Sequence, residues 1–226
     1  MARSATRAAR PGGVIFDLDG TLADSLSDIA SAMNRTLEAH GFPAHPVSAY
    51  RTFVGEGVRK LAERALPPGT EAVREAFIDA YQADYAEHLL DQTRLFPGIT
   101  EVLDGLQSAG VPVAVLSNKP DLPTRRLVDA LCSRWEFRAI FGERPGVPRK
   151  PDPTSALALA DALEAPPESV AFVGDTSVDI LTARAASMRP VGVLWGFRPQ
   201  EVLASGAEAA GTGEELARIL GIDDVA

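Results

Sequence analysis

The stretch VIFDLDGTL, residues 14–22, decides how this chain folds. Its first residues are apolar and predict a buried strand, yet two carboxylates, Asp17 and Asp19, follow directly. Like charges this close repel each other, and each carboxylate loses hydration in a dry site. We therefore expect a cation or a chemical task to hold both aspartates at the end of this strand.

Apolar runs similar to residues 14–16 recur at residues 111–116, 170–173 and 191–194. They are rich in Val and bounded by Gly, Pro, Ser or Asn, which is typical of buried strands in a parallel sheet. Residues 138–142 indicate one more short strand at an edge. Helical patterns lie between the runs, so the sequence predicts an α/β fold with a doubly wound, Rossmann-like parallel sheet.

The segment 23–93 breaks this alternation because it shows helical patterns without a strand. Ser25 and Asp28 form a predicted capping box at the start of its first helix. Two further amphipathic helices are predicted over residues 55–66 and 71–90. We therefore predict an all-α domain at 23–93, inserted into a core made of residues 11–22 and 94–226, with residues 1–10 as a disordered basic tail.

Polar residues follow the predicted strands at their carboxyl ends. Ser117 and Asn118 follow the second run, Asp175 follows the third, and Asp179 comes four residues later. Lys150 precedes the helix that leads into the third run. Because ligands bind beyond the carboxyl ends of strands in open α/β sheets, we expect these residues to meet Asp17 and Asp19 in one pocket.

This set of side chains suits phosphate chemistry. Carboxylates together with a substrate phosphate are typical ligands of Mg²⁺, and a lysine and a hydroxyl suit the phosphate oxygens. One aspartate can attack the phosphorus atom and form an acyl phosphate, and a second can act as acid and base. Lys119, beside Asn118, is either part of this site or a solvated lysine at a loop edge.

Four segments carry a family resemblance, namely FDLDGTLADS (16–25), VLSNK (115–119), RKPDP (149–153) and FVGDTSVDI (172–180). In this order and at these separations, they resemble the four motifs of the haloacid dehalogenase superfamily of phosphohydrolases. The resemblance runs from about Gly13 onward. The founding dehalogenases of that family lack an acid at the position of Asp19, so the resemblance argues against dehalogenation here.

The resemblance implies a role for each motif residue. Asp17 would be the nucleophile and a Mg²⁺ ligand, and Asp19 would be the acid/base and bind the metal through its backbone carbonyl. Asp175 would be a further metal ligand, while Asp179 would lie in the outer shell or merely cap the following helix. Ser117, Asn118 and Lys150 would hold the transferred phosphoryl group.

The insertion at 23–93 resembles the helical cap of the same family, which covers the pocket and selects the leaving group. Within it, FVGEGVRKL (53–61) resembles a specificity loop of phosphoglycolate phosphatase-like members. Arg59 and Lys60 would then meet a carboxylate or second phosphate of the substrate, unless they form an ordinary basic helix face. The segment 191–208 resembles the tail of this subgroup, where a loop borders the active site.

The composition of the chain limits the kinds of partner that it can bind. The formal net charge of −9 argues against a broad basic surface for nucleic acid, and no apolar run has the length of a membrane span. The one cysteine, Cys132, cannot form an internal disulfide, which suits a cytoplasmic protein. We expect a monomer or a homodimer that binds a small phosphorylated metabolite.

The leading hypothesis is a Mg²⁺-dependent phosphatase that hydrolyses a small phosphomonoester, at best estimate 2-phosphoglycolate, through an aspartyl-phosphate. A sugar-phosphate mutase resembling β-phosphoglucomutase is an alternative on the same scaffold. A non-catalytic binding or regulatory protein is a third hypothesis, and it predicts the loss of an acid or of the lysine. None of these residues is missing here.

Overall fold

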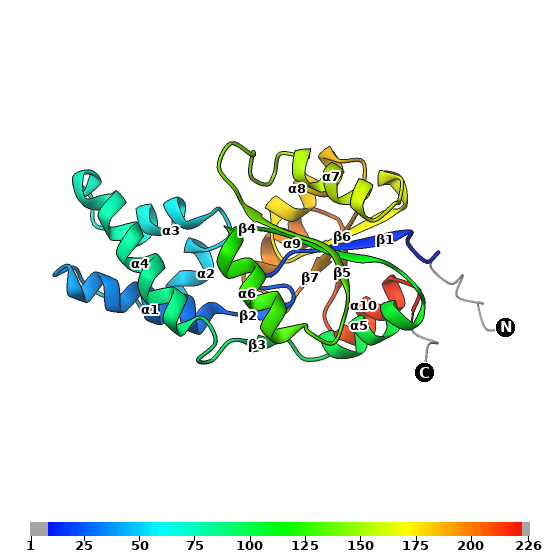
Figure 1. Ribbon diagram of the computed structural model, residues 1–226, viewed down its shortest axis with the longest axis horizontal. Coiled ribbons are helices and arrows are strands. Elements are labelled where there is room, and N and C mark those ends of the chain that lie inside the picture. The colour runs from blue at the N-terminus through cyan, green and yellow to red at the C-terminus, as the bar shows by residue number, and fades with distance from the viewer. Residues whose placement is uncertain (1–8, 223–226) are drawn as a thin grey trace.

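The computed structural model describes residues 9–222, so most of the predicted tail, residues 1–8, lies outside the described residues. The described chain forms a six-stranded sheet covered by helices on both faces, with a separate group of helices at one end (Figure 1). All neighbouring strands of this sheet are parallel. The predicted α/β, doubly wound fold is therefore confirmed.

The sheet has the strand order β5-β4-β1-β6-β7-β8. β1 lies at its centre and pairs with β4 on one side and with β6 on the other, so Val14 lies between Val113 and Ala171. The carboxyl ends of these three strands are therefore neighbours. The strands are β1 (Gly13–Phe16), β4 (Val113–Pro120), β5 (Phe137–Glu143), β6 (Val170–Gly174), β7 (Arg189–Val193) and β8 (Glu208–Ala210).

Alternate residues of the strands pack on opposite faces of the sheet, as the pleat requires. Ile15 and Phe172 join one apolar cluster with side chains of α7 and α8, whereas Phe16 and Val173 join another with α5, α6 and α10. The core helices are α5 (Ile99–Ser108), α6 (Asp121–Leu131), α7 (Thr154–Ala162), α8 (Ser177–Ala185), α9 (Pro199–Ala204) and α10 (Gly213–Ile219).

The remaining helices form a helical unit, defined here as α1 to α4 and visible on the left of Figure 1. They are α1 (Leu26–Ala39), α2 (Tyr50–Phe53), α3 (Val58–Ala65) and α4 (Arg74–His88). α1 packs along α4, and Tyr50 is fully buried, with its hydroxyl donating to Asn34 Oδ1 at 2.6 Å. These helices fit the predicted insertion, whose boundaries stay a prediction.

The helical unit joins the core through two short antiparallel strands, β2 (Ala23–Asp24) and β3 (Arg94–Leu95), which the sequence analysis did not predict. Each has two residues, too few for a period to be visible in the sequence. The pairing of these two strands brings the entry and the exit of the helical unit side by side.

The predicted capping box of Ser25 and Asp28 is wrong. Both residues instead make tertiary contacts: the Ser25 hydroxyl donates to Asp19 Oδ1 at 2.5 Å, and the Asp28 carboxylate accepts hydrogen bonds from the backbone N–H groups of Gln92 and Thr93. The Thr93 hydroxyl donates to the same carboxylate at 2.7 Å. Asp28 therefore ties the start of the helical unit to its end.

The sheet also extends beyond its prediction. β4 continues through Ser117 and Asn118 to Pro120, because β5 keeps pairing with it as far as Glu143. β8 was not predicted, since its three residues, Glu208 to Ala210, contain no large apolar side chain. The edge strand predicted at 138–142 is confirmed as β5.

Replacing Asp28 should destabilise the fold. Asp28→Ala leaves the N–H groups of Gln92 and Thr93 without their acceptor in a site where Asp28 is 2% exposed. We expect the free energy of unfolding, measured by urea denaturation, to fall by about 2–4 kcal/mol. Asp24→Ala, an exposed aspartate in β2, serves as the control and should change it by less than about 0.5 kcal/mol. Equal values for both variants would contradict this role of Asp28.

Candidate active site

The candidate active site lies where β1, β4 and β6 end. The loop after β1 turns back at Gly20, which has a φ of +90°. A Cβ atom there would lie 2.2 Å from Asp175 Oδ2, so this position requires glycine on two grounds. The turn lets Asp17 and Asp175 share one small space at the end of the sheet.

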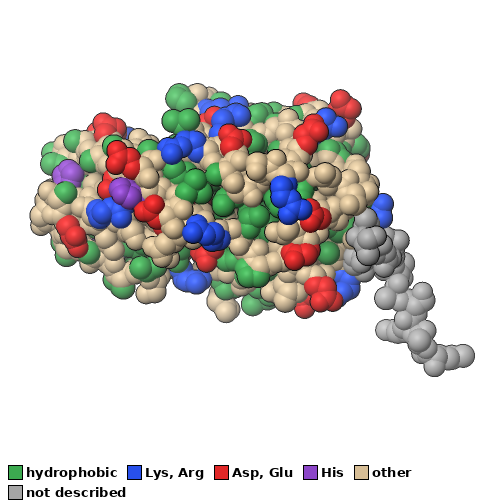
Figure 2. All heavy atoms as spheres, turned by 60° about the horizontal axis from the view of Figure 1, so that its bottom comes forward, with side chains coloured by type: hydrophobic (Ala, Val, Ile, Leu, Met, Phe, Trp, Pro, Cys, Tyr) green, Lys and Arg blue, Asp and Glu red, His purple; other side chains and the backbone are tan. Residues whose placement is uncertain are grey.

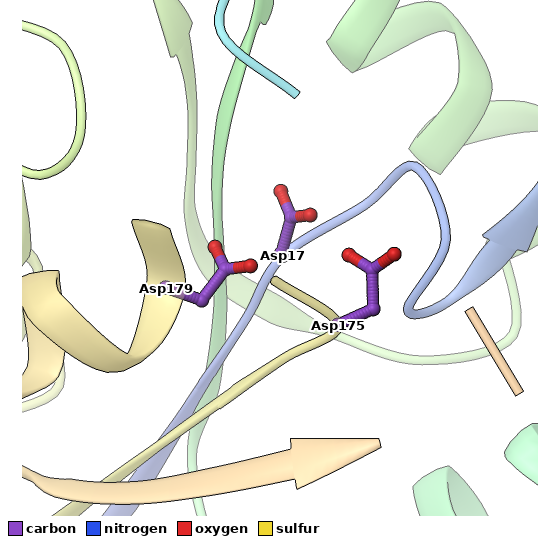
Figure 3. Close-up of side chains that lie close together, drawn as sticks. All are labelled: Asp17, Asp175 and Asp179. Carbon is purple, nitrogen blue, oxygen red and sulfur yellow. The ribbon is translucent and has the colours of Figure 1, made fainter. Parts of the chain in front are cut away.

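Three carboxylates meet in this space, those of Asp17, Asp175 and Asp179. Each offers one oxygen atom, and these three atoms all lie within 4.8 Å of one another (Figure 3). They come from the end of β1, the end of β6 and the first turn of α8. All three residues are buried. Such a concentration of negative charge needs positive charge nearby.

Lys150 supplies part of that positive charge. Its Nζ atom lies 2.7 Å from Asp17 Oδ1 and 2.7 Å from Asp179 Oδ1. Burial opposes the charge of the ammonium group, but Asp17 and Asp179 outweigh burial and raise the pKa of Lys150 above its usual value. Asp179 also accepts hydrogen bonds from the backbone and the hydroxyl of Thr176, so it caps α8 as well as pairing with the lysine.

One ammonium group does not balance three acids. Burial, aided by the nearby charge of Asp179, raises the pKa of Asp17 to about 7 although Lys150 opposes this shift. Burial and the charges of Asp17 and Asp179 raise the pKa of Asp175 well above its usual value. The site therefore favours a further positive charge or a proton.

Asp175 is the acid of this cluster that forms no ion pair with the described residues. Its Oδ2 atom accepts a hydrogen bond from the backbone N–H of Phe197 at 2.7 Å, but its Oδ1 atom is buried without any hydrogen-bond partner in the described part of the chain. An unpartnered carboxylate oxygen beside two further acids offers the oxygen ligands that hard divalent cations such as Mg²⁺ prefer. The three acids therefore fit a metal ion.

Asp19 pairs with a second lysine at the cavity that Asp17 also lines. Both carboxylate oxygens lie 3.0 Å from Lys119 Nζ, and Oδ1 also accepts the Ser25 hydroxyl. Lys119 is buried, and its ammonium group lies 4.6 Å from the ring centre of Tyr85. The side chain of Asp19 thus lines the same cavity as Asp17 and is paired with a lysine left open by the sequence.

Ser117 and Asn118 lie beside the acids at the end of β4. The Ser117 hydroxyl is buried and accepts the backbone N–H of Lys119 at 3.2 Å. The amide of Asn118 bonds the backbone of Lys150 in both directions, accepting from its N–H at 2.9 Å and donating to its carbonyl at 3.1 Å. Asn118 therefore holds Lys150 in place.

A cavity of about 250 Å³ opens beside Asp17 and Asp19, between the core and the helical unit. Ser117, Asn118 and Lys119 line its core side. Apolar and aromatic side chains dominate the side formed by the helical unit, namely Ile29, Val54, Val58, Leu61, Tyr81 and Tyr85. Arg59 and Lys60 do not line the cavity; they are exposed and pair with Glu75 and Glu63.

The segment 51–57 of the helical unit is bound to the core. Arg198 donates to the carbonyl groups of Arg51, Thr52 and Val54, and Asn118 donates to that of Gly55 at 3.1 Å. At Gly57, whose φ is +88°, a Cβ atom would lie 2.4 Å from Arg149 Nη1. These contacts close one side of the cavity.

Comparison with known proteins agrees with this geometry. A family model described as haloacid dehalogenase-like hydrolase matches residues 14–193. The chain belongs to this family. The predicted superfamily is therefore confirmed, and the match spans all four motifs found in the sequence.

Individual relatives of this hydrolase are phosphoglycolate phosphatases. That of Aquifex aeolicus is 34% identical over 184 residues, which cover 81% of this chain and 85% of the relative. Phosphoglycolate phosphatase 1 of Pseudomonas aeruginosa is 33% identical over 207 residues, covering 87% of this chain and 74% of the relative. The predicted enzyme class, a phosphoric monoester hydrolase of the phosphoglycolate phosphatase-like kind, is confirmed.

A solved structure has the same fold as this hydrolase. It is a "predicted phosphoglycolate phosphatase" from Haemophilus somnus, 26% identical, with a TM-score of 0.87 over 93% of this chain and 98% of the other. Within residues 9–222, each helix is too short or too polar to cross a bilayer.

The sequence analysis left Lys119 open and did not single out Tyr85 or Arg198. Lys119 directly follows Ser117 and Asn118, so the argument from strand ends applied to it equally. Tyr85 carried no such signal, because it lies in a helical segment of ordinary spacing, whereas Arg198 lies in the segment 191–208, which was expected to border the active site. Their place in the site depends on how the helical unit packs on the core.

Neutralising Asp17 should stabilise the metal-free enzyme. The pKa of Asp17 is raised to about 7 in the folded state, so its ionisation destabilises the fold progressively as the pH rises from about 4 to 7. We expect Asp17→Asn to increase the free energy of unfolding by a few kcal/mol at pH 8, and by little at pH 4.

The measurement is urea denaturation in EDTA at several pH values. Asp79→Asn, at an exposed position of α4, is the matched control and should show no such pH-dependent gain. A lower stability of Asp17→Asn at pH 8 would show that the ion pair with Lys150 outweighs the cost of burying the charge.

Proposed function

We propose that this hydrolase is a Mg²⁺-dependent phosphatase that hydrolyses 2-phosphoglycolate through an aspartyl-phosphate on Asp17. The observation that carries the proposal is the buried cluster of Asp17, Asp175 and Asp179, held by Lys150, with one Asp175 oxygen left unpartnered. The choice of substrate rests on the relatives, which are phosphoglycolate phosphatases.

Asp17, Asp175 and, through its backbone carbonyl, Asp19 would hold the Mg²⁺ ion, with Asp179 outside the first shell. When bound, the ion offsets negative charge on the carboxylates and on the phosphoryl oxygens. Asn118 bonds the backbone of Lys150, and Asp17 and Asp179 hold its ammonium group, so this group would meet the phosphoryl group with little reorganisation. Ser117 supplies a hydroxyl for the same group.

The reaction proceeds in two displacements at phosphorus. An Asp17 carboxylate oxygen attacks the phosphorus atom, the bond from phosphorus to the ester oxygen breaks, and Asp19 gives a proton to the departing alkoxide. In the second step, Asp19 takes a proton from a water molecule that attacks the phosphorus atom. The bond between phosphorus and Asp17 breaks and inorganic phosphate leaves.

The helical unit acts as the cap in this proposal. Its segment 51–57 is tied to the core by Arg198, Arg149 and Asn118 and covers the cavity beside Asp17. Excluding bulk water favours attack by one positioned water molecule over side reactions. Arg59 and Lys60 carry no role here because their charged ends lie in exposed ion pairs away from the cavity.

The enzyme would act in the cytoplasm on a small metabolite. Cys132 is buried, and burial raises the pKa of its thiol to about 12, so it stays a protonated apolar group. Acidic and basic side chains are interspersed over the face shown in Figure 2. That distribution suits a protein that recognises its ligand inside a cavity.

Phosphate release tests the mechanism. With Mg²⁺, we expect release of inorganic phosphate from 2-phosphoglycolate at a higher kcat/KM than from pyrophosphate, nucleoside monophosphates or hexose phosphates, and none with excess EDTA. Asp17→Asn should lower kcat by roughly a thousandfold or more while the far-ultraviolet circular dichroism spectrum is kept. Metal-independent release would overturn the proposal, and exchange between sugar-phosphate isomers without release would favour a mutase.

Metal binding can be measured without substrate, through the Tm of the protein. Adding Mg²⁺ without substrate should raise the Tm of the wild-type protein, because the ion binds the folded state alone. Asp175→Asn should remove most of that increase, whereas Asp79→Asn should keep it. A Mg²⁺-induced increase in Tm that survives in Asp175→Asn would exclude Asp175 as a ligand.

A further inference from the structure

Lys119 is the buried cation that lines the cavity. Among the described residues around the cavity, four carry charge: Asp17, Asp19, Lys119 and Arg126. Arg126 is exposed and donates to the carbonyl group of Ala86 at 2.7 Å. Lys119 is only 8% exposed. A negatively charged ligand inside the cavity would therefore meet Lys119.

The ammonium group of Lys119 has donor capacity to spare. It carries three N–H bonds, and the two oxygens of Asp19, each at 3.0 Å, accept two of them. Over residues 9–222, no other acceptor lies within hydrogen-bond distance of this nitrogen. The ring of Tyr85, whose centre is 4.6 Å away, is a weaker electrostatic partner than an anion.

The surroundings of Lys119 strengthen a hydrogen bond from its ammonium group to an anionic ligand. The cavity wall opposite the core is formed mainly by apolar side chains, including Ile29, Val54 and Leu61. In a site with little water, a hydrogen bond between two charged groups is shorter and stronger than between neutral ones. These surroundings favour a carboxylate over a neutral group of the same size.

We infer that Lys119 binds the carboxylate of the substrate and thereby selects a short, acidic leaving group. The inference rests on the proposed function, in which the phosphoryl group lies at Asp17. Lys119 Nζ lies 3.0 Å from both oxygens of Asp19, and Asp17, two residues before Asp19, lines the same cavity. A phosphoryl group at Asp17 and a carboxylate at Lys119 would therefore be joined by a short leaving group.

This role of Lys119 replaces the one that the sequence analysis expected for Arg59 and Lys60 in the helical unit. Arg59 bonds Glu75 and Lys60 bonds Glu63, both at the exposed surface. Lys119, by contrast, comes from β4 of the core and lies in the same strand as Ser117. The strand that offers a hydroxyl to the phosphoryl group also offers the cation that recognises the leaving group.

The experiment compares two substrates that differ at one group. 2-Phosphoglycolate and 2-hydroxyethyl phosphate have the same carbon chain, but the second carries a hydroxymethyl group in place of the carboxylate. The wild-type enzyme should prefer 2-phosphoglycolate. In Lys119→Met, kcat/KM for 2-phosphoglycolate should fall roughly 10- to 100-fold further than for 2-hydroxyethyl phosphate, mainly through KM.

Two further variants keep the test decisive. Lys119→Gln removes the charge and keeps an N–H donor for Asp19, so it should show the same selective loss even where Lys119→Met fails to fold. Lys60→Met tests the competing assignment to the helical unit. A selective loss in Lys60→Met and none in the Lys119 variants would overturn the inference.

The outcomes separate this inference from the proposed function. An equal loss on both substrates, through kcat, would show that Lys119 only positions Asp19, and the proposed phosphatase would stand. A wild-type enzyme that treats both substrates alike would overturn the carboxylate specificity and the choice of 2-phosphoglycolate together. Absence of Mg²⁺-dependent release from every ester would instead refute the proposed function itself.

Discussion

The contact on which the site depends is that of Lys150 Nζ with Asp17 and Asp179, at 2.7 Å from each. Burying an ion costs several kcal/mol, and the cost is offset only where the geometry is good and the other polar atoms are satisfied. Here those conditions are met by neighbours. Asn118 bonds the backbone of Lys150 on both sides, and Asp179 uses its second oxygen to cap α8 through Thr176. The ends of β4 and β6 are thus fixed around one ammonium group.

The same groups link the acids to the helical unit. The Asn118 amide that holds Lys150 also donates to Gly55, and Phe197, whose N–H bonds Asp175, is followed by Arg198, which binds the carbonyl groups of residues 51, 52 and 54. Segment 51–57 therefore docks on the two parts of the core that orient the lysine and Asp175. The contacts that close the cavity and those that orient the charged residues therefore involve the same residues.

The acids of the site could be predicted from the sequence because the signals that mark them lie in neighbouring residues. A short Val-rich run followed by acids marks a buried strand that ends in a polar site, and this applied to Asp17 and Asp175 alike. The contacts of residues whose partners lie far along the chain could not be predicted in this way. Asp28 has the spacing of a capping residue from Ser25, yet it bonds Gln92 and Thr93, which only the fold brings near. Arg59 and Lys60 likewise depend on how α3 faces its neighbours.

The departures from ordinary packing occur where the chemistry is proposed. A folded protein rarely leaves a buried carboxylate oxygen without a partner, as at Asp175 among residues 9–222, or holds an aspartate whose pKa is raised to about 7, as at Asp17. We expect both features to lower the stability of the metal-free fold and to diminish when a cation neutralises the acids. Stability and the proposed function would then be opposed at these residues, since the unbalanced negative charge that weakens the metal-free fold is what would attract a metal ion.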